Sequence, residues 1–104
     1  MESYKIFMTE SATQDLMGLS SYIANDLNEP SVAKKLIEKI KASVMSLTEL
    51  PLRHNLVSDE NLAAQGIRKT MVDNYLIFYI VSEKDKTISV VRILYCRRDW
   101  IHLL

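Results

Sequence analysis

The 104-residue sequence is poor in the residues that interrupt, cross-link or anchor a chain. It has two glycines and two prolines, too few for a disordered or repetitive segment. Its one cysteine, Cys96, excludes an internal disulfide framework and a multi-thiolate metal site. No apolar run approaches the length of a membrane helix, and the N-terminus lacks the pattern of a signal peptide. These absences predict one cytoplasmic domain over residues 1–104, with no metal, no cofactor and no membrane partner.

The net charge is zero, but the charges are unevenly distributed along the chain. Residues 1–65 carry six basic and nine acidic side chains, whereas residues 66–104 carry seven basic and four acidic ones. The basic residues of the second part include two adjacent pairs, Arg68–Lys69 and Arg97–Arg98. Either this asymmetry arises by chance, or the two pairs mark a surface that binds anions.

The first half of the chain predicts one strand and two helices. Residues 3–8 have the alternation of a short strand. Ser11 followed by Gln14 fits a capping box and predicts the start of a helix. Asn28 can end that helix in the left-handed conformation, and Pro30 suits the first position of the next helix. Because the connection is so short, the two helices must run antiparallel.

The second half predicts a loop followed by three strands. Residues 51–65 show no sustained period and predict a loop with one helical turn near its end. The segments after this loop are rich in β-branched and aromatic side chains. The predicted strands are residues 66–72, residues 75–82 and a strand that begins at Thr87 and runs into Arg97–Arg98, with turns at Asp73–Asn74 and Glu83–Lys86.

These elements, in the order β-α-α-β-β-β, predict an α+β domain. An antiparallel helical hairpin should pack on one face of a small, mostly antiparallel sheet, and the other face should be partly open. Alternation places Arg68 and Lys69 on opposite faces, so that one of the two cations faces away from the helices. In the last strand, alternation predicts that Val90, Arg92 and Leu94 face one way and Val91, Ile93 and Tyr95 the other.

The open face is expected to be a shallow basic surface with aromatic edges at Tyr75, Tyr79 and Tyr95. Arg97 and Arg98 follow the last strand, where two guanidiniums on rigid backbone can bind a phosphate or carboxylate in a forked geometry. The alternative is a solvated sheet edge whose charge deters aggregation.

The residues around this dibasic pair each have two interpretations. His102 either transfers protons near neutral pH or belongs to a frayed tail. Trp100 either anchors the tail on the domain or stacks on a nucleic-acid base. Cys96 is either a thiol made reactive by the arginines or a small, half-buried side chain.

Motifs along the whole chain resemble the RelE/ParE superfamily of bacterial toxins. They are the helix SATQDLMGLSSYIANDL, a second helix ending in LTELP, the hairpin IRKTMVDNYLIFYIV and the final segment VVRILYCRRDW, where many members carry glycine in place of Cys96. The resemblance implies the toxin of a type II toxin–antitoxin module, which arrests bacterial growth. It also implies a cognate antitoxin that covers the basic surface with an acidic or amphipathic segment.

The superfamily divides by target, and the resemblance leaves two mechanisms open. RelE-like toxins cleave mRNA on the ribosome, which requires cations at the phosphate and a base for the ribose 2′-hydroxyl. ParE-like toxins poison DNA gyrase, and the long helical hairpin looks more like theirs. Lys69 and Arg98 match the RelE pattern, but Leu76 stands where RelE carries an arginine, and RelE's C-terminal tyrosine has no counterpart near Leu104.

Ribosome-dependent mRNA cleavage is the first hypothesis, with gyrase inhibition as the alternative. A third hypothesis is a non-toxic module that pairs with a partner chain and represses its own operon. For cleavage, the predicted catalytic residues are Lys69, Arg98 and His102, and the predicted phosphate- or nucleic-acid-binding residues are Arg68, Arg97 and Tyr95.

Overall fold

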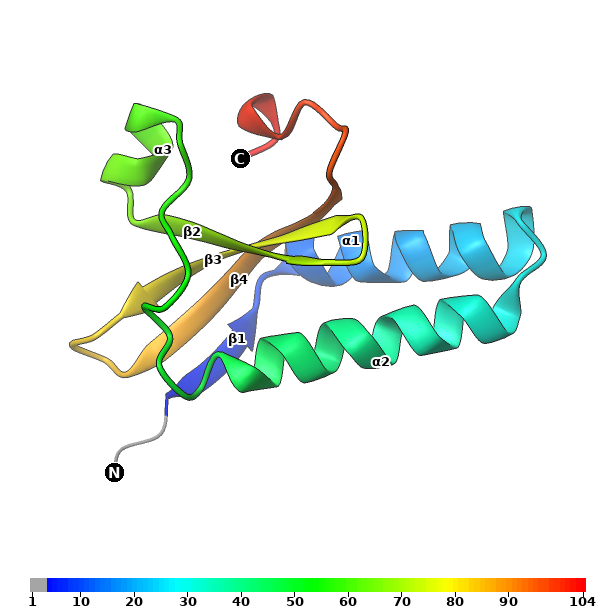
Figure 1. The fold of residues 1–104 in the computed structure, drawn as a ribbon, viewed down its shortest axis with the longest axis horizontal. Coiled ribbons are helices and arrows are strands. Elements are labelled where there is room, and N and C mark those ends of the chain that lie inside the picture. Colours follow the sequence, from blue (N-terminus) through cyan, green and yellow to red (C-terminus); the bar gives the residue numbers. More distant parts are fainter. Residues whose placement is uncertain (1–3) are drawn as a thin grey trace.

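The computed structural model describes residues 4–104, which form one sheet and several helices (Figure 1). The predicted first strand is confirmed from its third residue onward, and Ser3 lies outside the described residues. The elements are β1 (Lys5–Met8), α1 (Glu10–Ser21), a π-helix (Tyr22–Asp26), α2 (Pro30–Ser46), α3 (Glu60–Ala64), β2 (Ile67–Val72), β3 (Tyr75–Ser82), β4 (Thr87–Tyr95) and a 3₁₀ helix (Trp100–His102).

The four strands lie in the order β1-β4-β3-β2. β4 is antiparallel to β3 and β3 is antiparallel to β2, while β1 runs parallel to β4. The predicted α+β class, with a mostly antiparallel sheet and a helical hairpin on one face, is confirmed. The turn at Asp73–Asn74 is confirmed as well, because Val72 pairs with Tyr75 and Asp73 adopts a φ of 51°.

The helical hairpin begins and turns at residues that satisfy free backbone groups. Thr9 is the N-cap of α1, and its hydroxyl accepts a hydrogen bond from the Ala12 N–H. The capping box predicted at Ser11 is therefore wrong by two residues. Asn28 takes the left-handed conformation, with a φ of 55°, and Pro30 is the first residue of α2, as predicted. No helix within residues 4–104 is long and apolar enough to cross a membrane.

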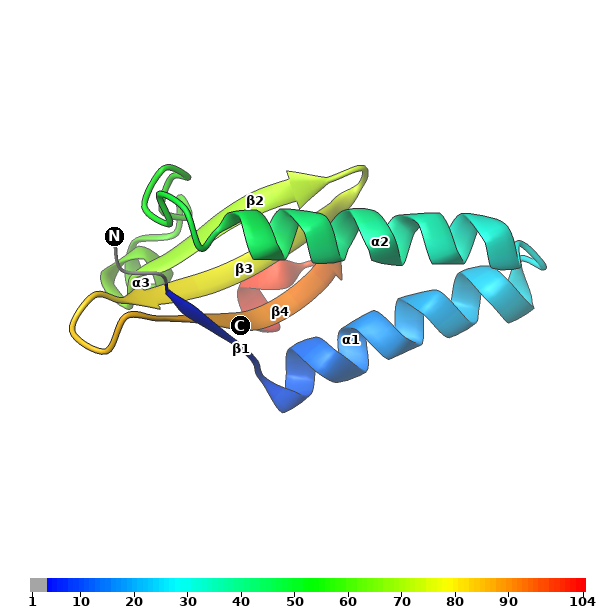
Figure 2. The ribbon, with the colours of Figure 1, turned by 90° about the horizontal axis from the view of Figure 1, so that it is seen from below.

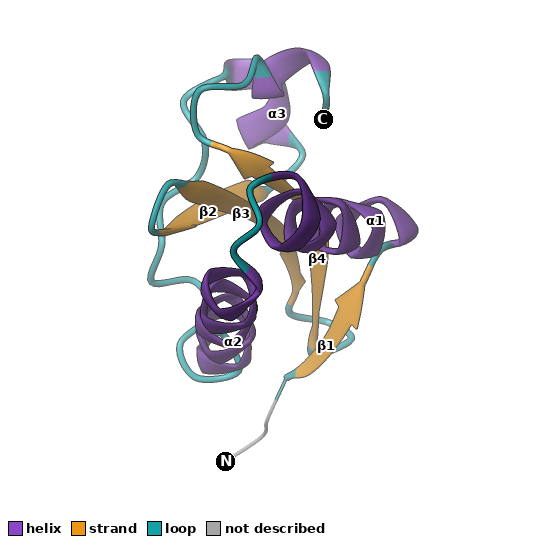
Figure 3. Ribbon diagram, turned by 90° about the vertical axis from the view of Figure 1, so that its right-hand side faces the viewer, coloured by secondary structure: helices purple, strands orange, loops and turns teal. Residues whose placement is uncertain are grey.

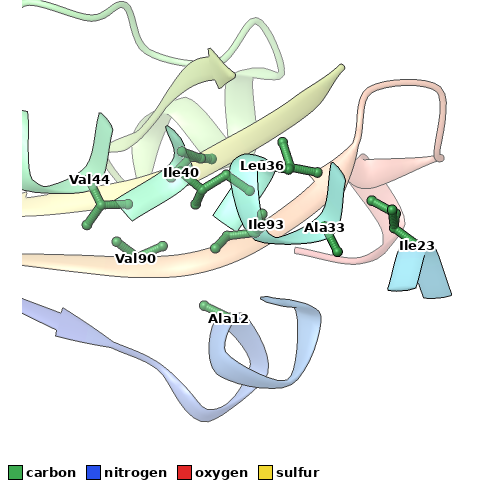
Figure 4. Packing of buried hydrophobic residues seen from close by; sticks show 9 residues of the cluster. Ala12, Ile23, Ala33, Leu36, Ile40, Val44, Val90 and Ile93 are labelled. Atoms are coloured by element: carbon green, nitrogen blue, oxygen red, sulfur yellow. The ribbon is translucent and has the colours of Figure 1, made fainter. Parts of the chain in front are cut away.

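The main core lies between the hairpin and the sheet. Figure 2 shows α1 and α2 lying across this face of the sheet, and Figure 4 shows the aliphatic side chains that meet there. The two helices contribute small and branched residues at helical spacing, and β3 and β4 contribute the residues opposite them. The buried members of this cluster are Ala12, Ile23, Ala33, Leu36, Ile40, Val44, Ile77, Val90 and Ile93.

The opposite face of the sheet is covered too, contrary to the expectation of a partly open face. There α3 and the C-terminal segment lie on the far side of the sheet from α2 (Figure 3). Phe78 in β3 is fully buried beneath them, and partly buried Trp100, Leu103 and Leu104 pack over this cluster. The chain gains a second small core in this way, and the face predicted to be open is largely apolar and occupied.

A β-bulge changes the facing of β4. Phe78 pairs with Arg92 but Tyr79 pairs with Val90, so Val91 is an extra residue on β4. Val90 consequently faces the hairpin together with Ile93, while Val91 packs with the cluster under the C-terminal segment. The predicted alternation holds from Ile93 to Tyr95 but is wrong for Val90 and Val91, because nothing in the sequence marks the inserted residue.

Candidate functional site

The C-terminal segment turns back over the sheet immediately after β4. The Cys96 N–H donates to the Asn74 carbonyl (2.8 Å), and the Arg98 N–H donates to the Tyr95 carbonyl (3.0 Å). The indole of Trp100 then packs on the ring of Phe78, with 5.2 Å between centroids. This contact confirms the interpretation of Trp100 as a tail anchor, and it brings the segment from Arg98 onward to the face that carries Lys69.

Lys69 contacts this segment through a cation–π interaction. Its Nζ lies 5.2 Å from the centroid of the Trp100 ring. Lys69 belongs to β2, and β3 separates that strand from β4, so Lys69 reaches the tail across one intervening strand. This contact joins Lys69 to the C-terminal segment, which contains the other two predicted catalytic residues, Arg98 and His102.

Arg68 faces the other way, as strand alternation predicts, and holds a loop in place. Its Nη1 donates to the carbonyls of His54 (2.7 Å) and Leu52 (3.4 Å). The backbone of the same loop pairs with β2 at Leu56 and donates from Val57 to the Ile67 carbonyl (3.0 Å). Arg68, predicted to bind phosphate, is engaged by backbone carbonyls on the face opposite Lys69.

Arg97 and Arg98 are exposed, and within residues 4–104 their guanidiniums make no hydrogen bond or ion pair. His102 is also exposed, and its Nε2 lies 3.5 Å from a carboxylate oxygen of Asp99. The dibasic turn therefore carries two cations whose donors are available to a partner. The charged neighbour of His102 is therefore Asp99, three residues earlier in the chain.

Tyr95 points toward the hairpin face and joins an aromatic group there. Its ring packs edge-on against that of Tyr75, with 5.6 Å between centroids. Burial raises the pKa of Tyr75, and the neighbouring phenols of Tyr95 and Tyr22 raise it further. Tyr79, also predicted at the edge of an open face, is instead fully buried, and its hydroxyl donates to the Pro51 carbonyl (2.8 Å). The predicted basic surface with these aromatic edges does not form.

A partly buried ion pair joins α1 to β4, and sequence reasoning missed it. Asp15 accepts from Arg92 Nε (2.7 Å) and Nη2 (2.9 Å), and from the Ile93 N–H (3.0 Å). The third guanidinium nitrogen of Arg92 donates to the Leu103 carbonyl (2.9 Å). The bond to Asp15 raises the pKa of Arg92 above its ordinary value. The available sequence signal was Arg92 itself, a cation between Val91 and Ile93 in a strand of apolar residues.

Arg92 also lines a pocket of about 260 Å³ between the start of α1, the sheet and the tail. The guanidinium is already bonded on all three nitrogens, so this pocket presents mostly aliphatic side chains to a ligand. In the described part of the chain, no group of three His, Cys, Asp or Glu side chains is placed to hold a metal. The pocket is lined by Ser11, Gln65, Ile67, Ile80, Val91, Arg92, Leu103 and Leu104.

His54 is the titratable group on the loop held by Arg68. Partial burial, followed by the nearby charge of Arg53, lowers the pKa of His54. Its Nε2 accepts a hydrogen bond from Arg53 Nε (3.2 Å), which requires the neutral ring. Burial and a neighbouring charge account for this pKa shift, and His54 lies on a different loop from Arg97 and Arg98.

Lys69 and the C-terminal segment that carries Arg98 and His102 therefore lie on one face of the sheet, and Arg68 lies on the other. Lys69 stacks on Trp100, His102 pairs with Asp99, and Arg68 is bonded to a loop on the other face. Leu76, where RelE-like enzymes carry an arginine, is 5 % exposed and packs beneath the tail. General acid–base chemistry needs its groups within hydrogen-bonding reach of one reacting phosphate, and within residues 4–104 neither Lys69 nor His102 hydrogen-bonds to another predicted catalytic residue.

Comparisons with known proteins are consistent with this fold. Residues 6–100 match the family model described as the ParE toxin of the type II toxin–antitoxin system, parDE. A chain of the chromosomal ParDE toxin–antitoxin system from P. aeruginosa has a similar structure, with a TM-score of 0.72, 20 % identity and coverage of 89 % of this chain and 96 % of that one. A chain of the toxin–antitoxin complex RelBE2 from Mycobacterium tuberculosis gives a TM-score of 0.61, 19 % identity and coverage of 90 % and 99 %. No curated protein matches the sequence significantly.

Proposed function

As the chain belongs to the ParE toxin family of type II toxin–antitoxin systems, we propose that it arrests bacterial growth by acting on DNA gyrase. This reverses the order of the two mechanisms suggested by the sequence alone. Gyrase inhibition by a bound protein requires a surface complementary to the target, and it needs no set of converging catalytic groups in the toxin.

The position of Leu76 carries this proposal. A cation in place of Leu76, the second residue of β3, would face the tail side of the sheet, next to the strand that bears Lys69. That position instead holds a buried leucine under Trp100. An oxyanion or phosphate at this place would meet aliphatic and indole surface, with Lys69 as its neighbouring cation and no second cation from β3.

The toxin is also proposed to pair with a cognate antitoxin. Arg97 and Arg98 form no ion pair within residues 4–104, so an acidic segment of the antitoxin can neutralise them. Binding of such a segment would order it along the dibasic turn, with charge-assisted hydrogen bonds to the two guanidiniums.

The experiment that separates the mechanisms compares the two targets directly. Purified toxin, released from its antitoxin, is added to gyrase in a DNA supercoiling and cleavage assay, and to a translating extract in which mRNA ends are mapped. We expect loss of supercoiling or gyrase-linked DNA breaks, with intact messages. Cuts in translated mRNA with unaffected gyrase would overturn the proposal.

Messenger RNA cleavage remains the second candidate because the two free guanidiniums and Lys69 suit RNA phosphate. Under that mechanism, loss of one positioned cation would slow cleavage by about a hundredfold. Harmless expression of the soluble chain would exclude both mechanisms and favour a module that acts only through its partner.

A further inference from the structure

The helical hairpin projects beyond the start of β3 and the end of β4 (Figure 1), and a tyrosine stands at each of these two strand termini. Tyr75 begins β3, Tyr95 ends β4, and their rings are in edge-on contact. Tyr22 begins the π-helix, and the next residue, Ile23, belongs to the buried cluster against which Tyr75 packs; the phenol of Tyr22 also raises the pKa of Tyr75. We call Tyr22, Tyr75 and Tyr95 the tyrosine patch. Tyr22 is 52 % exposed and Tyr95 is 39 % exposed, so two of the three rings meet solvent.

The dibasic turn is fixed next to this patch. Arg97 is two residues from Tyr95, and the turn is held by the hydrogen bond from the Cys96 N–H to Asn74 and by that from the Arg98 N–H to Tyr95. The chain geometry keeps the Arg97 and Tyr95 Cα atoms within about 7 Å of each other. Asp73, in the neighbouring turn, already has a partner in Lys39, whose Nζ lies 3.4 Å from its carboxylate. With Asp73 paired, the two arginines of the turn outnumber Asp99, the carboxylate that follows them, so the turn carries a surplus of positive charge.

Tyrosines beside an arginine are typical of the residues that contribute most of the binding energy at protein interfaces. Tyrosine and arginine are enriched among residues that dominate binding, because each offers a large contact area together with a polar end. The rings of Tyr75 and Tyr95 pack edge-on at 69°, so one ring covers a face of the other and the two do not form a pair of open stacking surfaces for successive bases. The chain as a whole is also neutral, without the excess of basic residues typical of nucleic-acid-binding domains.

We infer that the tyrosine patch, together with Arg97, is the surface that binds the toxin's target, and that it recognises an acidic segment of a protein. The inference rests on the proposed function in that the target is a protein. Unlike Arg92, whose guanidinium is bonded on all three nitrogens, Arg97 has no partner within residues 4–104, so its donors are available for carboxylates, and the exposed Tyr95 lies two residues before it.

The test measures growth arrest for full-length variants expressed from a titratable promoter, with each soluble protein quantified. Tyr22→Ala, Tyr95→Ala and Arg97→Glu should each require about tenfold more toxin for half-maximal arrest, and Arg97→Lys should be much less affected. Two matched controls are Met17→Ala, an exposed side chain earlier in α1, and Lys84→Glu, a charge reversal in the β3–β4 turn at the other end of the sheet. Both controls should arrest growth like the wild type.

Thermal melting checks the folding of every variant, and binding to the co-expressed antitoxin is a second check for Tyr22→Ala and Tyr95→Ala alone, because Arg97 is itself proposed to contact the antitoxin. Variants that are folded and still fully toxic would overturn the inference, as would variants that lose only antitoxin binding. Binding of a fluorescent single-stranded DNA oligonucleotide that Tyr22→Ala abolishes would also overturn it. If the patch variants lose growth arrest while wild-type toxin leaves purified gyrase unaffected, the gyrase proposal fails and the tyrosine patch stands. If expression of the wild-type chain proves harmless, both the gyrase proposal and the inference about the tyrosine patch are refuted.

Discussion

Replacing Asp15 by alanine tests the ion pair that ties α1 to β4. The side chains of Asp15 and Arg92 are 12 % and 21 % exposed, so the pair is largely shielded from water. The substitution leaves Arg92 without its carboxylate and the Ile93 N–H without an acceptor. Breaking a buried pair from one side costs roughly 3–5 kcal/mol, and residual exposure places this case near the lower end. We expect the free energy of unfolding to fall by about 3 kcal/mol.

Urea denaturation followed by circular dichroism measures this loss, which should lower the melting temperature by about 12–24 °C. Trp100 is the single tryptophan and packs on the tail cluster, so its fluorescence reports the same event locally. Since Arg92 also donates to the Leu103 carbonyl, we expect the emission of Asp15→Ala to shift to the red before the main transition.

Two controls identify the ion pair as the cause. Asp15→Asn keeps an oxygen that can accept from the Ile93 N–H, so it should cost about half as much. The double variant with Asp15→Leu and Arg92→Met removes both charges, and it should be less destabilised than the sum of the two single substitutions. A loss below about 1 kcal/mol for Asp15→Ala, with an unchanged denaturant slope, would refute the reasoning.

Three further predictions concern the tail and the loop held by Arg68. Lys69→Met should cost about 0.5–1 kcal/mol in urea denaturation through the lost cation–π contact with Trp100, and leave growth arrest intact, whereas a catalytic lysine would make it nearly inactive. Trp100→Ala should cost about 2 kcal/mol by the same measurement, since the ring is only partly buried on Phe78. The pKa of His54 lies below its ordinary 6.5, so the unfolded chain binds the proton at a higher pH than the folded one. The melting temperature should therefore fall as the pH drops through and below 6.5, and His54→Gln should reduce this dependence of the melting temperature on pH.

Most of the fold could be predicted because its turns and helix ends depend on short, local residue patterns. The positive φ of Asn28, the first helical position of Pro30 and the turn at Asp73–Asn74 each depend on one or two residues with special backbone preferences. The bulge at Val91 has no such local marker, because it arises from how β4 meets β3 and α1. The cap at Thr9 was missed for a similar reason: its hydroxyl also donates to the Val91 carbonyl (3.0 Å), a contact 82 residues away.

The candidate site was harder to predict than the fold. Alternation placed Arg68 and Lys69 on opposite faces, but it could not show that carbonyls of the preceding loop would occupy Arg68. The fold-back of the tail depends on Trp100 finding Phe78, a tertiary contact. The predicted roles of Arg98 and His102 stay predictions, and the exposed guanidiniums beside Tyr95 now support a different use of the same turn.

The parallel pairing of β1 with β4 also determines when the toxin can become active during its own synthesis. Lys5 pairs with Thr87, and Asp15 needs Arg92, so the first strand and helix leave the ribosome long before their partners. At about 5–20 residues per second, that interval lasts roughly 4–16 s. The strand β4 that completes the sheet also ends in the tyrosine and arginines of the proposed target surface. A nascent chain is therefore expected to be harmless until its final residues emerge, which gives an antitoxin made beforehand time to meet it as it folds.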